Sequence, residues 1–326
     1  MASVTRARAR AHARLARLAA VAALLTVSAC GVLDGGAQAP PDTPATSVSS
    51  AASVSSTSSL EHRMLGVPVG VDFRPEVHGF AFSNFAPARY PQRFDARALV
   101  AVAGAGPRIC VDGVEGVELD EGWDLAGSDV PCEVTEEAAA FIAMVEASRA
   151  GGHCEGMVVL AALRYTWGLE PVTAEVPDDE RTIDAIIRAF ATIFLPEVQA
   201  EARSWMSTSL ADTVEVLALA LSEEILDYGM GIYRPDGGHE VLPYAIEYPR
   251  EGLARVLVYD TNWPGAERFV DIDLANDTWR FSFAGDDQET DPHAWEGGHV
   301  DLDLNSVAVR IAALESRGVV VAPPGT

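Results

Sequence analysis

The stretch Gly151-Gly152-His153-Cys154-Glu155-Gly156-Met157 places a cysteine directly before an apolar segment. Residues 157–163 are apolar nearly all round, which is typical of a helix buried on every side. The two glycines before the cysteine favour a tight turn. The sequence therefore predicts that Cys154 stands at the amino end of a buried helix, where the helix dipole favours a thiolate.

A second stretch, from Gly237 to Gly265, supplies a histidine 85 residues after Cys154 and two candidates for a third catalytic group. His239 follows Gly237-Gly238 at the start of one predicted strand. Asp260 ends the next strand, and Asn262 comes two residues later. A thiol nucleophile needs a histidine as its base, and the histidine needs a third group to hold its tautomer. We expect Cys154, His239 and Asp260 to fill these roles, with Asn262 as the alternative to Asp260.

Around these stretches the sequence pattern changes from helices to strands. Helical periodicity, capping residues and apolar runs predict helices at residues 95–103, 136–149, 154–168, 179–194, 197–206 and 209–226. Strand patterns separated by turn residues follow at 231–234, 240–248, 255–260, 269–274 and 278–283. Helices followed by an antiparallel meander predict the α+β class. Alternating aromatics also predict a short strand at 79–85.

The order Cys, His, Asp resembles the papain-like fold of the cysteine peptidases and of their transglutaminase-type and leader-peptidase relatives. In that fold the cysteine heads a central helix that packs on an antiparallel sheet carrying the histidine and the acid. The motifs Gly-His-Cys-x-Gly-Met and Tyr-Asp-x-Asn-x-Pro-Gly, which end here at Met157 and Gly265, also look like a group of bacterial exported proteins. The resemblance covers residues 80–283.

The resemblance implies a hydrolase that cleaves a peptide or other amide through a thiol acyl-enzyme, without a cofactor. Papain-type enzymes carry a glutamine before the cysteine as oxyanion donor, whereas Ser148 stands six positions before Cys154 here. His153 and Asn84 are the candidate replacements. Asn262-Trp263 is similar to the Asn-x-Trp element of papain-type enzymes, so Trp263 is expected to cover the histidine. A transglutaminase-like acyl transferase and a non-catalytic surface lipoprotein with a relic triad are the alternatives.

The amino terminus has the pattern of a bacterial export signal. Residues 1–29 combine an arginine-rich start with a short apolar segment, and Val27-Ser28-Ala29-Cys30 looks like a lipobox. This implies cleavage before Cys30 and a lipid anchor on its sulfur; an ordinary secretory signal is the alternative. Residues 30–60 are rich in Ser, Thr, Ala and Pro and predict a disordered tether. We therefore expect an exported, membrane-anchored protein with a hydrolase domain at 61–284 and an acidic extension at 285–326.

The remaining cysteines predict a disulfide in an oxidising compartment. Cys110 and Cys132 bracket an acidic loop and are the expected pair, which leaves Cys154 as a thiol; a Cys132–Cys154 pair is the alternative. No zinc spacing links Cys154 to the histidines, so no metal is expected. Residues 301–305 resemble half a calcium loop but lack its glycine and distal glutamate. They more simply predict an edge strand with outward carboxylates.

The charge excludes two classes of partner. The formal net charge is −25, all 23 basic residues are arginine, and five of these lie in the leader, so 18 arginines face 48 acidic residues in the rest of the chain. Nucleic acids and anionic lipid surfaces bind through basic groups. We expect a self-repelling, monomeric protein whose partners are a peptide or protein substrate and the bilayer reached through Cys30; a cationic partner for the acidic face is the alternative.

Overall fold

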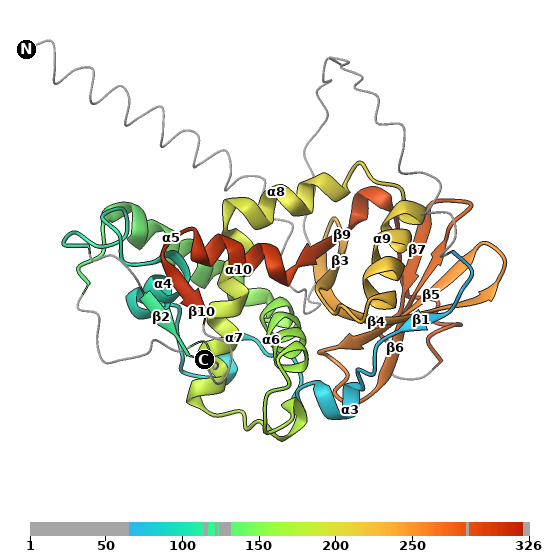
Figure 1. Ribbon diagram of the computed structural model, residues 1–326, viewed down its shortest axis with the longest axis horizontal. Coiled ribbons are helices and arrows are strands. Elements are labelled where there is room, and N and C mark those ends of the chain that lie inside the picture. Colours follow the sequence, from blue (N-terminus) through green and yellow to red (C-terminus); the bar gives the residue numbers. More distant parts are fainter. Residues whose placement is uncertain (1–64, 114–116, 121–122, 124–131, 285–286, 322–326) are drawn as a thin grey trace, which may run out of the picture.

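An antiparallel sheet of eight strands forms one side of the molecule, and most of the helices form the other (Figure 1). This computed structural model describes residues 65–113, 117–120, 123, 132–284 and 287–321. The strand order is β8-β7-β6-β5-β4-β3-β9, and β1 pairs with β4. The strands are β1 (Val69–Gly70), β3 (Tyr228–Arg234), β4 (Gly237–Arg250), β5 (Leu253–Asp260), β6 (Glu267–Asp273), β7 (Thr278–Phe281), β8 (Trp295–Gly298) and β9 (Leu302–Ser306). The predicted α+β class and the meander from β3 to β7 are confirmed.

The register of the meander places three polar side chains in a diagonal row. Val241 of β4 pairs with Asp260 of β5, and Val258 of β5 pairs with Arg268 of β6. Paired residues share a face of the sheet, and so do residues two apart on one strand. His239, Asp260 and Arg268 therefore lie on the same face, each diagonal to the next.

The helices mostly precede β3 in the chain. They are α3 (Pro75–His78), α4 (Ala96–Ala103), α5 (Glu136–Ser148), α6 (Cys154–Thr166), α7 (Glu180–Ala191), α8 (Pro196–Trp205), α9 (Leu210–Ser222) and α10 (Val307–Glu315). The side chains of Asp95, Thr135, Asp179 and Ser209 each accept the backbone N–H three residues on, which satisfies a donor that the helix leaves unpaired. Among the described residues, no helix is long and apolar enough to cross a membrane.

Helix α6 lies in the core and touches both α7 and β4. All residues from Cys154 to Leu163 are buried. Gly156 permits the approach to α7, because a Cβ at this position would lie 2.2 Å from the carbonyl oxygen of Ile186. The third glycine of the opening stretch is thus required by helix packing.

The segment before α4 is irregular, so the strand predicted at 79–85 is wrong. Its aromatics are buried by packing across the sheet end, not by strand pairing. The N–H of Phe80 donates to the hydroxyl of Tyr259 at 3.0 Å, and the N–H of Asn84 donates to the carbonyl of Thr261 at 2.8 Å. The segment therefore ties the amino-terminal part of the described chain to the end of β5.

The boundary predicted at residue 284 is also wrong, because the carboxy-terminal part completes the fold. β8 and β9 are strands of the main sheet, and α10 packs on α8. After α10 the chain forms β10 (Val319–Val321), which pairs in parallel with β2 (Val117–Leu119). The high acidity of this part was misleading, since Asp303 of β9 is only 6% exposed. β9 is an edge strand as predicted, but Asp303 does not point outward.

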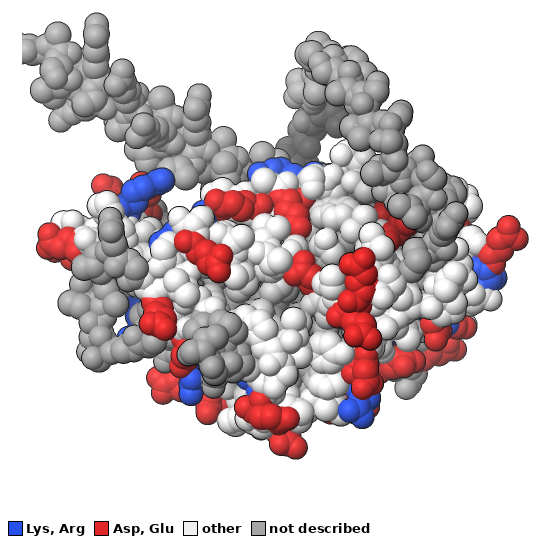
Figure 2. Space-filling view, in the orientation of Figure 1, with Lys and Arg blue, Asp and Glu red and all other residues white. Residues whose placement is uncertain are grey.

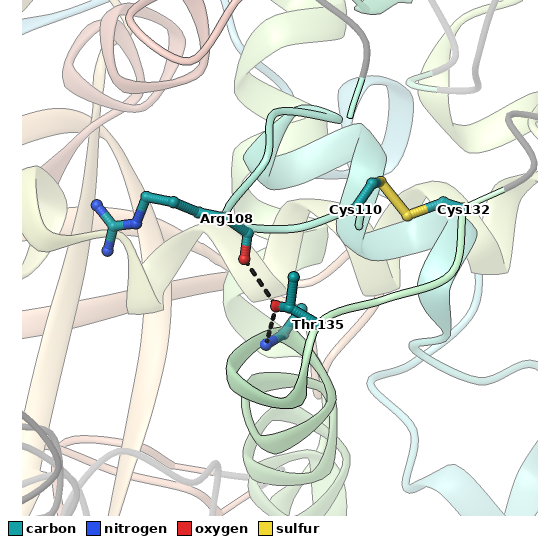
Figure 3. Close-up of a disulfide and its surroundings, with 5 residues drawn as sticks. Arg108, Cys110, Cys132 and Thr135 are labelled. Carbon is teal, nitrogen blue, oxygen red and sulfur yellow. Dashed lines mark hydrogen bonds between the residues drawn. A yellow bond between two sulfur atoms is a disulfide. The ribbon is translucent and has the colours of Figure 1, made fainter. Parts of the chain in front are cut away.

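The disulfide between Cys110 and Cys132 is confirmed (Figure 3). An isolated antiparallel bridge between Cys110 and Val134 pairs the two segments that the disulfide joins. Thr135 adds a link, because its hydroxyl donates to the carbonyl of Arg108 and accepts the N–H of Ala138 at the start of α5. The disulfide thus fixes the approach to α5, the helix that leads into the Cys154 turn.

The surface is acidic, as the composition requires. Acidic side chains are spread over much of the face seen in Figure 2, with fewer arginines between them. Such a surface favours solubility through self-repulsion and disfavours polyanionic partners. The predicted export signal and tether, including Cys30, lie outside the described residues.

Candidate active site

Cys154 is the first residue of α6 and is 1% exposed. The turn before it requires glycine at position 152, where φ is +116° and a Cβ would lie 2.7 Å from the side-chain amide of Asn84. The backbone N–H of Glu240 donates to the Cys154 sulfur at 3.4 Å. A helix amino terminus together with this N–H favours negative charge on the sulfur.

The oxidation state of Cys154 bears on its chemistry. Cys154 is disulfide-bonded in the structure, while Cys110 and Cys132 are bonded to each other. The expectation of an unpaired Cys154 thiol is therefore not met, and the alternative Cys132–Cys154 pair is wrong. Nucleophilic chemistry at Cys154 belongs to the reduced form of its disulfide, because only a thiolate can attack.

His153 has a structural place beside Cys154. Its ring is buried and stacked on Phe85 with 4.4 Å between ring centroids. Nδ1 donates to the carbonyl of Phe85 at 2.8 Å, because Nε2 accepts from Nε of Arg149 at 2.9 Å. Burial, helped by the charge of Arg149, lowers the pKa of His153 to about 4. Both ring nitrogens are engaged and the ring is neutral at pH 7, so His153 is placed to hold the turn.

Asn84, the other predicted oxyanion donor, joins the two halves of the site. Its side-chain oxygen accepts the N–H of His153 at 2.7 Å and that of Phe85 at 2.9 Å. Its own N–H donates to Thr261, directly after Asp260. Its side-chain amide nitrogen lies beside Gly152, at the turn before Cys154. Asn84 therefore links the turn before Cys154 to the end of β5.

His239 pairs with Asp260, as the sequence predicts. His239 Nε2 lies 2.8 Å from Asp260 Oδ1, and both residues are buried. The backbone N–H of Asn262 donates to the same Oδ1 at 2.8 Å, while its side-chain nitrogen lies 3.4 Å from Nε2. With Nε2 held by the carboxylate, Nδ1 is the ring nitrogen left to exchange a proton. Asp260 is thus the direct partner of the ring, and Asn262 flanks it.

Aromatic rings enclose the histidine, although not the one that the sequence suggested. Phe283 lies 5.3 Å and Phe281 6.0 Å from His239, measured between ring centroids. Trp263 instead lies over the guanidinium of Arg268, which is 5.1 Å from its ring centroid. Trp263 therefore shields the arginine behind Asp260, and Phe283 takes the covering position.

Cys154 and His239 share one small cavity. Its remaining lining residues are Glu155, Phe190, Tyr233, Gly238 and Glu240. The helix start, the first residues of β4 and the end of β3 thus meet at one point. Among the described residues, no cluster of three or more histidine, cysteine or acidic side chains could hold a metal ion. The groups at the cavity are those of acid, base and nucleophilic chemistry.

A buried cluster of acids lies behind this cavity, and the sequence did not reveal it. Glu155 pairs with Arg310 of α10, whose other nitrogen donates to the hydroxyl of Thr192 at 2.7 Å. Burial raises the pKa of Glu155 against the opposing charge of Arg310. Burial, together with the charges of Glu155 and Asp303, raises the pKa of Glu240 well above its usual range. Burial raises the pKa of Asp303 to about 7, although the hydroxyl of Tyr233 donates to it.

The raised pKa of Asp303 predicts a pH-dependent stability. An unfolded aspartate releases its proton near pH 3.9, but folded Asp303 keeps it until about pH 7. The native state therefore binds more protons between these values, and the free energy of unfolding falls as pH rises through this window. Asp303→Asn is expected to reduce that slope by up to about 1.4 kcal/mol per pH unit. Urea unfolding at several pH values measures the slope.

The control for this prediction is Asp236→Asn, because Asp236 is exposed. It should leave the wild-type slope unchanged. Equal slopes for wild type and Asp303→Asn between pH 4.5 and 7 would show that Asp303 is not the group that retains the proton.

Comparisons with protein-family models, with curated proteins and with solved structures find no match for this chain. What the site does must therefore be argued from its own geometry.

Proposed function

We propose that this protein is a cysteine hydrolase of the papain-like type that cleaves a peptide or other amide through an acyl-enzyme. The observation that carries the proposal is the His239–Asp260 pair opening onto the cavity that Cys154 lines at the start of α6. A helix amino terminus, a base and a group that orients the base are the three parts that thiol catalysis needs. The reduced form of Cys154 is the active one.

The reaction follows from these roles. The Cys154 thiolate attacks the carbonyl carbon of the amide, and the carbonyl oxygen takes the negative charge. The C–N bond then breaks, and His239 gives the proton from Nδ1 to the departing amine. A water molecule then attacks the thioester, His239 takes one of its protons, and the acid leaves with Cys154 restored. Asp260 holds the imidazolium through Nε2 in both halves.

The negative oxygen of the intermediate needs donors that stand ready before the reaction. The backbone N–H groups at the start of α6 have no partner within the helix and point out of its amino end. The side-chain nitrogen of Asn84 lies at the preceding turn and is the side-chain donor that we assign. This arrangement would take the place of the missing glutamine, with Ser148 left to α5.

The first experiment looks for the acyl-enzyme. The full chain, mildly reduced, is incubated with a library of peptides and N-acyl amides, and mass spectrometry follows both the products and the Cys154 peptide. We expect cleavage products and an acyl adduct on Cys154, and neither in Cys154→Ala. Products formed equally by Cys154→Ala would contradict the proposal. Addition of a primary amine separates the rival reaction, since an acyl transferase would yield the amine conjugate in place of the acid.

We also propose that the enzyme is exported and held on a bacterial membrane by a lipid on Cys30. The sequence motif Val27-Ser28-Ala29-Cys30 supports this, and the tether after it would let the hydrolase domain stand off the bilayer. The chain has four cysteines and Cys110 pairs with Cys132, so a lipid on Cys30 would go with Cys154 in the reduced form that the reaction needs. A Cys30→Ser variant that remains in the membrane fraction would contradict the anchor.

A further inference from the structure

We propose that Arg268 is a positioning residue that holds the Asp260 carboxylate turned toward His239. The inference rests on the proposed function, because it assigns a role within the same site. Arg268 is on β6, outside every motif that the sequence singles out. It occupies the third place in the diagonal row that begins with His239 and continues through Asp260.

The contacts of Asp260 leave one oxygen for the arginine. Oδ1 lies 2.8 Å from His239 Nε2, and it accepts the backbone N–H of Asn262 at 2.8 Å. Oδ2 faces Arg268, whose Nε is 4.0 Å away. Neither Oδ2 nor this Nε has a hydrogen-bond partner among the described residues, although both are buried. A buried carboxylate needs a compensating charge, and an arginine stays charged at any pH in which the protein works.

Arg268 also holds the segment that carries Phe283, whose ring packs against His239. Its two terminal nitrogens donate to the carbonyls of Ser282 and Ala284, at 2.6 and 2.7 Å. These carbonyls flank Phe283, whose ring packs against His239. One guanidinium thus fixes the acid on one side of His239 and the aromatic ring on another.

The surroundings of Arg268 keep water out of this contact. Arg268 is 1% exposed and Asp260 fully buried, and the Trp263 ring covers the guanidinium. Burial lowers the pKa of Arg268, while the charges of Asp260 and Asp291 oppose that change. In such a setting an ion pair acts with little screening by solvent, so removal of the arginine should free the Asp260 carboxylate to turn away from His239.

The test compares Arg268→Gln and Arg268→Lys with a matched control, Arg280→Gln. Arg280 of β7 makes the same kind of contact, donating to the carbonyls of Gln288 and Asp291 at 2.7 and 2.6 Å. It therefore anchors the neighbouring segment at residues 288–291, and its hydrogen bonds within the described residues do not reach Asp260. Thermal unfolding of the full chain measures the stability loss that all three variants share.

The first readout is the pH profile of Cys154 alkylation by iodoacetamide in the mildly reduced chain. We expect the midpoint to rise by about one pH unit in Arg268→Gln, because a carboxylate that turns away from His239 supports the imidazolium less. Arg268→Lys should restore at least half of the shift through its charge, and Arg280→Gln should leave the midpoint unchanged. An unchanged midpoint in Arg268→Gln, or an equal shift in Arg280→Gln, would overturn the inference.

A second readout separates the inference from the proposed function. In a Cys154→Ser background, NMR follows the signal of the ring N–H that His239 shares with Asp260. Arg268→Gln should move this signal upfield, because a carboxylate that turns away no longer accepts the N–H, whether or not the enzyme turns over. A wild-type chain whose alkylation does not depend on His239 would contradict the proposed function alone, whereas an unmoved N–H signal would contradict the role of Arg268. If Arg268→Gln does not fold, the Lys variant carries both readouts.

Discussion

At pH 6, iodoacetamide is expected to alkylate Cys154 of the reduced wild-type chain about tenfold faster than Cys154 of a His239→Ala variant. An ordinary thiol titrates near pH 8.5, so well under a hundredth of it is thiolate at pH 6. A neighbouring imidazolium lowers that midpoint by about two units or more and raises the thiolate fraction roughly a hundredfold. Part of the gain is lost, because a less basic thiolate is a weaker nucleophile. A net gain of about tenfold remains.

The full pH profile is the sharper form of this test. The wild-type rate should flatten above about pH 6.5, while the variant should continue to rise toward about pH 8.5. Timed alkylation followed by peptide mapping measures Cys154 alone, apart from Cys110 and Cys132. His299→Ala is the control, because His299 is partly exposed and pairs with Asp277 away from the cavity. Coincident profiles for wild type and His239→Ala would contradict the role of His239 as the base. A reduced Cys154 that stays unlabelled in the folded protein would contradict its role as the nucleophile.

The backbone signals around the site were strong enough to be read from the sequence. Glycines at 151 and 152, followed by ten residues that pack inward, predict a helix start, and α6 begins at Cys154. Turn residues between β4 and β5 set which residues end the strands, so the meander brings Asp260 to His239. These features depend on local propensity and on period-2 pairing, which a single sequence records.

The buried arginines Arg268 and Arg310 were not predicted, although strand and helix periodicity place each of them on a buried face. Arg268 alternates in phase with Val270 and Ile272, the buried residues of β6. Arg310 lies in phase with Val307, Ala313 and Leu314 on α10. A charged residue on an apolar phase signals a buried, paired group. The sequence does not say which partner it meets, because that depends on elements far apart in the chain.

Other failures have the same origin. The aromatic alternation at 79–85 fits a strand, but the backbone N–H groups of this segment donate to Tyr259 and Thr261 at the sheet end. The pairing of β2 with β10 joins two three-residue strands about 200 positions apart, for which local pattern gives no signal. Acidity in the carboxy-terminal part suggested a surface extension, whereas β9 carries a buried aspartate into the main sheet.

The second large effect is on the free energy of unfolding. It concerns the buried ion pair between Arg310 and Glu155, the residue that follows Cys154. Arg310→Met is expected to lower the free energy of unfolding at pH 7.5 by about 3–5 kcal/mol, because it leaves Glu155 buried without its cation. Glu240 and Asp303 would add to the cost, since Arg310 is the cation that offsets both of them. Urea unfolding of the full chain measures the change.

Two further variants separate the charge from the packing. Glu155→Gln combined with Arg310→Met removes both charges and should recover most of the loss, since replacement of a whole buried pair is often nearly neutral. Arg317→Met is the matched control: its pair with Glu197 is partly exposed and should be worth under about 1 kcal/mol. A double variant as unstable as Arg310→Met would show that the cost is lost packing of the long side chain.

The loss in the free energy of unfolding caused by Arg310→Met, which we call the deficit, should depend on pH. The direction of this dependence is an independent test of the charge argument. Burial already raises the pKa of Glu155, and Arg310 opposes that rise. Without the arginine, native Glu155 should hold its proton to a higher pH than the unfolded chain does, so the deficit grows as pH increases from about 5 to 8. A deficit that stays constant over this range would contradict the charge argument. Glu155 directly follows Cys154, so Arg310 of α10 places a positive charge beside the start of α6. In the proposed mechanism this charge offsets the acid that would otherwise oppose a thiolate at Cys154.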